Sequence, residues 1–388
     1  MAKRRSHTAL TSIIFLILGI IAGFVYSVFA SLPESFIIPK SVNISSAPQS
    51  SSSINAEVVK SKDLSVHFLE LGNKYTGDCT LVDVGDVEVL IDAGSKASSI
   101  ETINSYISPY VDGILDYVVV THAHEDHYAG FATNESTESL FDIYTVGTII
   151  EFAKTNKTES NRLHANYIRE RNTEVANGAK CFTALECWNE SIVEGNQAQK
   201  SFNLGNDVYL EILYQKFYEE TASTENDYSV CLMINQNNEK HYLFTGDLEK
   251  DGEKSLVDNN TLPIVDVYKA GHHGSSTSST DYLLSVIKPK VVCICCCAGS
   301  SEYTSKPENQ FPTQKFINNV TKYTKQIYVT SLCEDYKTAK FTSFNGNIVV
   351  YSNNNEQLII ACSKSDVILT ESEWFKKNRT LPDDAVNN

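Results

Sequence analysis

The sequence has little of what a nucleic-acid-binding protein or a many-span membrane protein usually carries. Basic residues are fewer than acidic ones, 32 against 48, and the formal net charge is −16. An acidic body repels polyanions at long range, so the charge balance gives no support to a DNA-binding role, although a local basic groove remains compatible with it. Only one long apolar run occurs, at residues 9–30, which excludes a membrane channel built from several spans.

That single apolar run follows Lys3, Arg4 and Arg5. Its length predicts a transmembrane anchor at 9–30, with residues 1–8 in the cytoplasm and the rest of the chain outside. The run ends in Val28-Phe29-Ala30, which also fits a signal-peptide cleavage site, so a secreted protein is the alternative.

The remaining chain divides by composition into three predicted parts. Residues 31–62 are rich in Ser, Pro and Asn, which is typical of a flexible linker. Residues 63–376 carry the strand and helix patterns of one folded domain, and 377–388 form a polar tail.

The ten cysteines are mostly scattered, but four of them gather in Cys293–Cys297. This stretch reads as a buried strand in which cysteine serves as a small apolar residue; a metal site built from the cluster is the alternative. Cys181 and Cys187 could close a short loop in an oxidising compartment, but spacing does not establish a disulfide.

Strand and helix patterns alternate through the folded part and predict a mixed α/β domain. Its two halves each begin with strands and finish with helices. The clearest expected strands are 65–71, 79–84, 87–92, 115–120, 144–150, 208–214, 228–234, 241–244, 264–267 and 291–298, and the clearest expected helices are 99–110, 160–176 and 282–287.

Metal-ligating residues follow three of these strands. His122, His124, Asp126 and His127 come directly after the apolar strand 115–120. Asp247 follows the strand 241–244, and the pair His272-His273 stands between two glycines after the strand 264–267. Strand ends hold loop side chains in fixed positions, and neutral imidazole with carboxylate suits borderline ions such as zinc. Together these residues offer enough donors for two metal ions.

At these motifs the sequence resembles the metallo-β-lactamase superfamily, from about Leu64 to Phe375. The run 122–127 matches the H-x-H-x-D-H signature, and 90–94 matches the strand and turn before it. Four further stretches resemble the branch that includes the hydrolase domain of the competence protein ComEC: Gly77-Asp78, 226–230, 243–249 and 271–275.

The resemblance implies an αββα four-layer sandwich with two divalent metal ions at one edge of the sheets. His122 and His124 would hold one metal, Asp126 and His127 the other, and Asp247 would bridge them, so that Asp126 and Asp247 act in catalysis. His272 is the expected last ligand, with His273 as its substitute. Asp92 would orient a ligand from behind. Zinc is the expected metal, and manganese or iron would also accept these ligands.

Two departures from the family pattern matter. Members with a complete first site carry a further His before the bridging Asp, where this chain has Asn226 and Ser229. The ComEC-like branch usually carries a late His-Pro pair, and this chain has Phe311-Pro312 instead. The first metal is therefore expected to be held by fewer protein ligands, and any role of the late His is lost.

The resemblance and the apolar N-terminus together predict an exported, membrane-anchored hydrolase. Its expected substrate is a phosphodiester or related ester, either a small molecule or part of the cell envelope. Lys269, Ser275 and Ser276 are candidates for phosphate contact. A nuclease linked to DNA uptake and a non-catalytic metal-containing binding protein are the alternatives, and the oligomeric state stays open.

Overall fold

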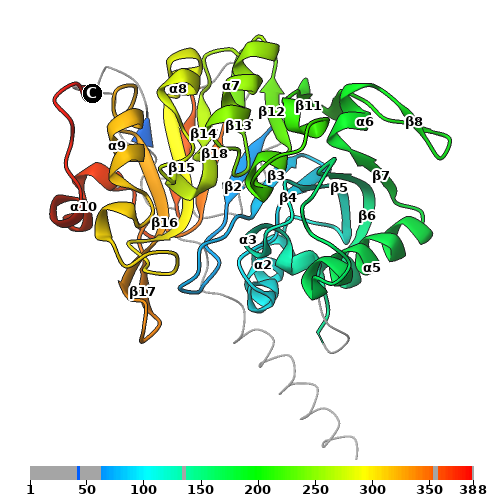
Figure 1. The fold of residues 1–388 in the computed structure, drawn as a ribbon, viewed down its shortest axis with the longest axis horizontal. Coiled ribbons are helices and arrows are strands. Elements are labelled where there is room, and N and C mark those ends of the chain that lie inside the picture. Colours follow the sequence, from blue (N-terminus) through cyan, green and yellow to red (C-terminus); the bar gives the residue numbers. More distant parts are fainter. Residues whose placement is uncertain (1–41, 44–62, 133–136, 353–356, 387–388) are drawn as a thin grey trace, which may run out of the picture. The chain divides into compact units, whose positions relative to one another are not determined.

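The computed structural model describes residues 42–43, 63–132, 137–352 and 357–386. The predicted segments 1–8 and 9–30, and nearly all of 31–62, lie outside the described residues. Among the described helices, none is both long and apolar enough to cross a bilayer. The described residues belong to one compact unit, which contains two large sheets and the helices packed around them (Figure 1).

The first sheet has nine strands in the order β1-β19-β18-β2-β3-β4-β5-β6-β7. Strands β4, β5, β6 and β7 run parallel, and the remaining pairs are antiparallel. The strands are β1 (Val42–Asn43), β2 (Ser65–Phe68), β3 (Thr80–Val84), β4 (Val87–Ile91), β5 (Ile114–Val120), β6 (Thr145–Glu151), β7 (Lys180–Thr183), β18 (Ile348–Tyr351) and β19 (Ile359–Cys362).

The second sheet has eight strands in sequence order from β10 to β17. The four strands from β13 to β16 run parallel to one another. The strand pairs on either side of this group, from β10 to β13 and between β16 and β17, are antiparallel. The strands are β10 (Ser201–Gly205), β11 (Val208–Leu213), β12 (Cys231–Gln236), β13 (Lys240–Phe244), β14 (Val267–Lys269), β15 (Val291–Ala298), β16 (Ile327–Asp335) and β17 (Lys340–Ser343). A small separate hairpin joins β8 (Ile192–Val193) and β9 (Asn196–Gln197).

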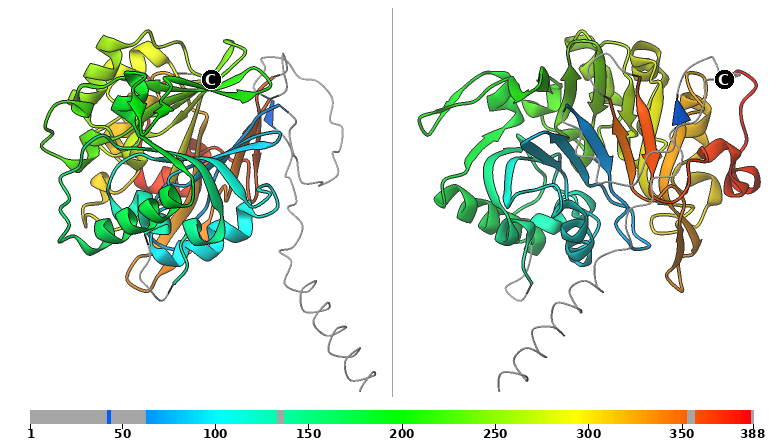
Figure 2. Two further views of the ribbon diagram at one scale, coloured as in Figure 1. Left: turned by 90° about the vertical axis from the view of Figure 1, so that its right-hand side faces the viewer. Right: turned by 180° about the vertical axis from the view of Figure 1, so that it is seen from behind.

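Helices cover the outer face of each sheet, as two views of the ribbon show (Figure 2). The helices are α2 (Ile100–Ile107), α3 (Glu125–Tyr128), α4 (Leu140–Ile143), α5 (Arg162–Ala176), α6 (Ala184–Trp188), α7 (Lys250–Asn259), α8 (Asp281–Ile287), α9 (Gln314–Val320) and α10 (Glu373–Asn378). Helices α2 and α5 contribute to the apolar cluster of the first sheet, and α7, α8 and α9 to a second cluster on the other sheet.

The side chains of β15 explain why the sheets stack face to face. Residues that alternate along a strand point to opposite sides. On one side of β15, the apolar cluster that links both sheets contains Val291, Cys293 and Cys295. On the other side, the cluster that includes residues of α8 and α9 contains Val292, Ile294 and Cys296. Phe68 of β2 stacks on Phe244 of β13 across the same interior, with ring centroids 6.1 Å apart. The predicted αββα sandwich is confirmed.

The cysteine-rich strand is buried along its whole length, which confirms its interpretation as a core strand. Burial raises the pKa of the thiols of Cys295 and Cys296 to about 12, so neither is a thiolate at neutral pH. All ten cysteines lie within the described residues and are free thiols, including Cys181 and Cys187.

Candidate metal centre

The His-rich loop leaves the carboxyl end of β5 and is clamped by two neighbouring turns. The backbone N–H of Asp78 donates to the carbonyl of Asp126 at 3.0 Å, and that of Ala93 donates to the carbonyl of His127 at 2.7 Å. At Gly94 the chains approach so closely that a Cβ would lie 1.6 Å from the Asp126 carbonyl oxygen. Only glycine fits there, so the turn after β4 fixes the backbone of α3, from which His127 projects.

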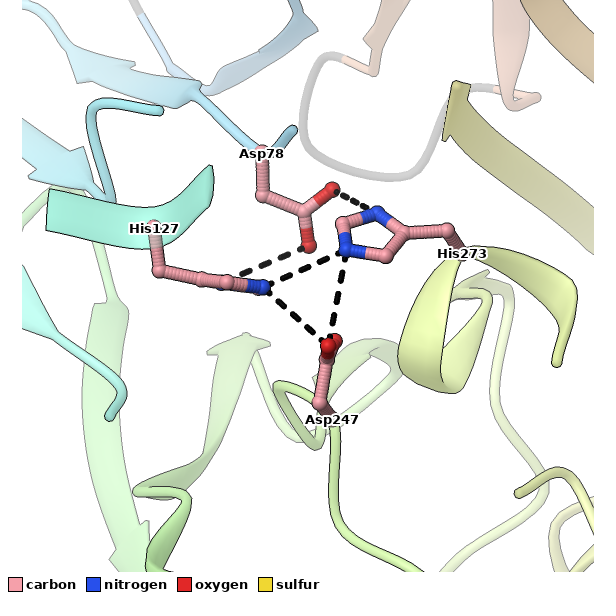
Figure 3. A group of neighbouring side chains, drawn as sticks. All are labelled: Asp78, His127, Asp247 and His273. Atoms are coloured by element: carbon pink, nitrogen blue, oxygen red, sulfur yellow. Dashed lines mark hydrogen bonds and ion pairs between the residues drawn. The ribbon is translucent and has the colours of Figure 1, made fainter. Parts of the chain in front are cut away.

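Four buried side chains converge beside this loop: Asp78, His127, Asp247 and His273 (Figure 3). One possible ligand atom from each lies within 4.8 Å of all the others. The Nε2 atoms of His127 and His273 are 3.3 Å apart, and they lie 3.2 and 3.5 Å from Asp247 Oδ2. This is a suitable spacing for donors around one cation.

Asp92 determines which ring nitrogen of His127, and through Thr121 of His122, carries the hydrogen. Its Oδ2 accepts from His127 Nδ1 at 2.8 Å and from the Thr121 hydroxyl at 2.8 Å. Since that hydroxyl donates to Asp92, its oxygen accepts from His122 Nδ1, 3.2 Å away. In the neutral imidazoles both Nε2 atoms therefore carry the lone pair, and they lie 3.2 Å (His127) and 3.9 Å (His122) from Asp247 Oδ2. The resemblance implied an orienting role for Asp92, and these hydrogen bonds supply it.

Asp78 lies next to both Lys269 and His273. Its Oδ2 pairs with the buried Lys269 ammonium at 2.7 Å, and its Oδ1 lies 3.0 Å from His273 Nδ1. The same Nδ1 lies 3.0 Å from the Cys295 carbonyl, which requires a hydrogen on Nδ1 and leaves Nε2 free. Asp78 Oδ1 itself makes no hydrogen bond among the described residues, so Asp78 stays a candidate ligand within the four-residue group.

Asp78 was not among the predicted site residues. A sequence signal for Asp78 was present, since Gly77-Asp78 belongs to the motifs that carry the resemblance. Asp78 lies far upstream of the His loop in the sequence, however, and the sequence does not show that the two lie close together in space. The expected phosphate contact from Lys269 is wrong. That side chain is buried against Asp78, and although burial opposes it, this carboxylate raises the pKa of Lys269 above its usual value.

Asp247 lies at the centre of the histidines. Its Oδ2 lies within 3.9 Å of four Nε2 atoms: those of His127 at 3.2 Å, His273 at 3.5 Å, His272 at 3.7 Å and His122 at 3.9 Å. The other oxygen, Oδ1, is buried without a hydrogen-bond partner among the described residues. A buried carboxylate oxygen without a hydrogen-bond partner is costly unless a cation joins it. The donor set therefore fits metal binding.

His122 and His124 form the other side of the site. His122 Nε2 lies 3.0 Å from His124 Nδ1. Where superfamily members with a complete first site carry a further His, Ser229 accepts from the Asp247 backbone N–H at 3.0 Å, and its Oγ lies 3.4 Å from His122 Nδ1. Asn226 turns its amide to Glu249 at 3.0 Å. This side therefore has two imidazoles and the shared Asp247 carboxylate.

Asp126 completes the second side. Its Oδ2 lies 3.6 Å from His273 Nε2 and accepts from the Tyr303 hydroxyl at 2.8 Å. Burial works against ionisation, but the neighbouring His273 and His127 hold the pKa of Asp126 well below its usual value. Conversely, Asp247 and Asp92 overcome burial and raise the pKa of His127. The site therefore attracts positive charge, which a metal ion supplies as well as a proton does.

The structure separates the two adjacent histidines. His273 is fully buried within the four-residue group, whereas His272 lies at its edge, with Nδ1 3.0 Å from the Thr277 hydroxyl. The resemblance suggested His272 as the last ligand and His273 as its substitute. In the structure it is His273 that lies among the candidate ligands Asp78, His127 and Asp247. Both residues have positive φ, 48° and 52°, as does Asp92 at 58°. Such backbone costs about 1–3 kcal/mol per residue, and it persists where the surrounding structure enforces it.

The site opens into a cleft of about 630 Å³. His124, Asp126, Asp247 and His272 form part of its wall, together with Lys96, Lys157 and Tyr303. Lys96 is paired with Glu125 at 2.5 Å, whereas Lys157 has no carboxylate partner among the described residues. The cleft gives a substrate direct access to the candidate ligands.

Comparison with known proteins agrees with this geometry. Residues 72–133 match the family model of the metallo-β-lactamase superfamily, a segment that contains the His-rich loop. Recombination protein 2 of Haemophilus influenzae is 39% identical over 70 residues, which are 18% of this chain and 8% of that protein. The chain thus spans less than a tenth of the length of this relative.

Similar solved structures include the metallo-β-lactamase fold protein YhfI from Bacillus subtilis, at 12% identity and a TM-score of 0.41, covering 69% of this chain and 96% of that one. A long-form RNase Z from yeast has 11% identity and a TM-score of 0.35, covering 62% and 38%. The predicted resemblance to the metallo-β-lactamase superfamily is confirmed, and the fold with its buried Asp/His group fits a dinuclear metal site. These features indicate a metal-dependent hydrolase.

Proposed function

We propose that this protein is an exported hydrolase that uses two divalent metal ions, zinc first among them, to cleave phosphodiesters. The observation that carries the proposal is the position of Asp247 Oδ2, within 3.9 Å of four imidazole nitrogens. A structural tetrahedral site needs fewer donors and no open cleft. The arrangement therefore supports catalysis over a purely structural metal.

The residues divide into two ligand groups that share Asp247. His122 and His124 would hold one ion; Asp126, His127 and His273 would hold the other. Ions bound here would supply a water nucleophile near neutral pH and neutralise charge on the substrate. Asp92 acts on His127 Nδ1 and the Cys295 carbonyl acts on His273 Nδ1, and these hydrogen bonds keep both imidazoles in the tautomers that bind.

Lys157 supports an anionic substrate. Lys157 and His124 line the same cleft, and burial together with the Lys157 charge lowers the pKa of His124. A phosphodiester carries a negative charge that repels nucleophiles, and the Lys157 ammonium in the cleft attracts it. A neutral carboxylester gains nothing from that cation.

Export and anchoring belong to the same proposal and rest on residues 3–30. Uncleaved, this segment would hold the catalytic domain at the outer face of the cell membrane. The intact mass of the mature protein distinguishes the anchor from the alternative of a cleaved signal. A mass that corresponds to a chain starting near Met1 supports the anchor. A mass that corresponds to a chain starting after Ala30 contradicts it.

The catalytic assignment is tested with Asp247→Ala on bis-p-nitrophenyl phosphate, a p-nitrophenyl carboxylester and labelled DNA. Loss of an outer partner of a ligand costs roughly 10–100-fold in activity, so loss of the shared ligand should reduce phosphodiester turnover by more than about a hundredfold. Asp258→Ala is the matched control, because Asp258 is an exposed partner of Lys254 outside the cleft.

Full activity of the Asp247→Ala protein would contradict the assignment. Turnover of DNA without turnover of the small phosphodiester would replace the substrate class with a nuclease. Bound metal with no turnover on any of these esters would favour a binding protein.

A further inference from the structure

Tyr303 brings a hydroxyl donor to the open side of the candidate metal centre. It lies in residues 299–313, between β15 and α9, outside every motif that carries the family resemblance. Its hydroxyl donates to Asp126 Oδ2 at 2.8 Å, and the residue is 57% exposed on the wall of the cleft. The phenol therefore faces a candidate ligand and solvent at once.

The segment that carries Tyr303 is held in place on both sides. Glu302 accepts from the Thr76 backbone N–H at 2.9 Å. The Tyr303 ring packs against Phe311 with centroids 5.5 Å apart, and the Phe311 ring lies 5.7 Å from His272 and 6.1 Å from His273. The Phe311 side chain has no polar atom, so in this pair of rings the hydroxyl of Tyr303 is the hydrogen-bond donor.

A substrate ester held over the metal centre would approach this hydroxyl. Hydrolysis places negative charge on the oxygens around the reacting phosphorus or carbon, and a fixed O–H donor stabilises that charge. A phenol stays protonated at neutral pH, with an ordinary pKa of about 10, so it donates without giving up its proton. The exposed face of Tyr303 leaves room for the hydroxyl to turn from Asp126 to a substrate oxygen.

We propose that Tyr303 is a catalytic residue, whose hydroxyl holds Asp126 in the free protein and donates a hydrogen bond to an oxygen of the substrate ester during hydrolysis. No proton is transferred in this role, and no bond of Tyr303 is made or broken. The proposal rests on the proposed function and adds a residue that the ligand motifs do not contain.

The test compares Tyr303→Phe with wild-type protein in kcat, KM and metal content. Phenylalanine keeps the ring contact with Phe311 and removes only the hydroxyl. Loss of one such donor is expected to lower kcat by about a hundredfold, with KM nearly unchanged and the same metal content per chain. Tyr282→Phe is the matched control, since Tyr282 is 48% exposed and its hydroxyl donates to the carboxylate of Asp258 at 2.6 Å away from the site.

Three results would overturn the proposal. Unchanged kcat in Tyr303→Phe would show that the hydroxyl does not act on the substrate. A loss of metal that parallels the loss of kcat would make Tyr303 a positioning residue for Asp126. Absence of turnover in the wild-type protein would overturn the proposed function as well, which distinguishes that failure from the first two.

Discussion

At the scale of single residues, one buried carboxylate links both sides of the metal centre. Asp92 reaches His127 directly and His122 through Thr121, and the Thr121 backbone N–H adds a third hydrogen bond at 2.8 Å. The backbone of Asp92 has a positive φ of 58°. One residue thereby sets the tautomers of a ligand in each group.

Gly94 gives a residue-scale prediction. In Gly94→Ala the new methyl group would collide with the Asp126 backbone, so the turn after β4 and the His loop must separate. We expect metal affinity to fall by at least about tenfold, because ligand positions shift, together with a stability loss on the order of 1–3 kcal/mol. Metal titration followed by urea unfolding measures both.

Gly113→Ala is its control, because no atom lies within 4 Å of the position of the added Cβ, although φ is +104° there. Gly113→Ala therefore shows how much stability is lost when alanine replaces glycine without a steric clash. Equal metal affinity in Gly94→Ala and Gly113→Ala would contradict the role of the close approach.

The residue scale also shows what sequence predicts and what it does not. The spacing in 122–127 and the strand before Asp247 predict where ligands lie, because strand ends meet at one sheet edge. The choice between His272 and His273 depends on backbone angles of 48° and 52° that no local pattern encodes. The contact of Asp78 with His273 joins residues 195 positions apart and needs the packed fold.

At the scale of elements, helix α7 holds the segment that follows His273. Glu253 on α7 accepts from the backbone N–H groups of Ser279 and Thr280, at 2.5 and 2.8 Å, and from the Thr280 hydroxyl at 2.6 Å. These bonds tie the start of α8 to α7. The loop with both histidines lies directly upstream of this contact.

This contact predicts a pH-dependent stability. Burial, with a smaller contribution from Asp227, raises the pKa of Glu253 from 4.5 to about 7. The folded state thus binds a proton more tightly than the unfolded state, so the contribution of Glu253 is full below its unfolded pKa and is lost as pH rises through about 7. The stability gap between wild type and Glu253→Ala should shrink by about 2 kcal/mol between about pH 5.5 and about pH 7.5.

Urea unfolding of both proteins at the two pH values measures the gap. Glu239→Ala, a change in the turn between β12 and β13, serves as the control. A gap that widens with pH would contradict the assignment.

Element prediction succeeded where apolar periodicity was strong. Strands β3, β4, β5, β11 and β15 lie within a residue or two of their expected bounds. Helices α7 and α9 were not predicted, because α7 is largely polar and four of the seven residues of α9 are polar. Both are stabilised by packing onto the second sheet, a contribution that local propensity does not contain.

At the scale of the whole molecule, the two stacked sheets bring the ligands together. The carboxyl ends of the parallel pairs β4–β5 and β13–β14 deliver the His loop, Asp92, Asp247 and His273 to one site. No single segment of the chain holds the complete ligand set. Metal binding should therefore require the folded domain, and it should stabilise that domain in turn.

The measurement that tests the account most directly is metal content by mass spectrometry, paired with phosphodiester turnover before and after chelation. The account predicts about two divalent ions per chain, loss of turnover when they are removed, and recovery when zinc or manganese is restored. Turnover that survives complete removal of metal would contradict it, as would a protein that binds two ions and hydrolyses no ester.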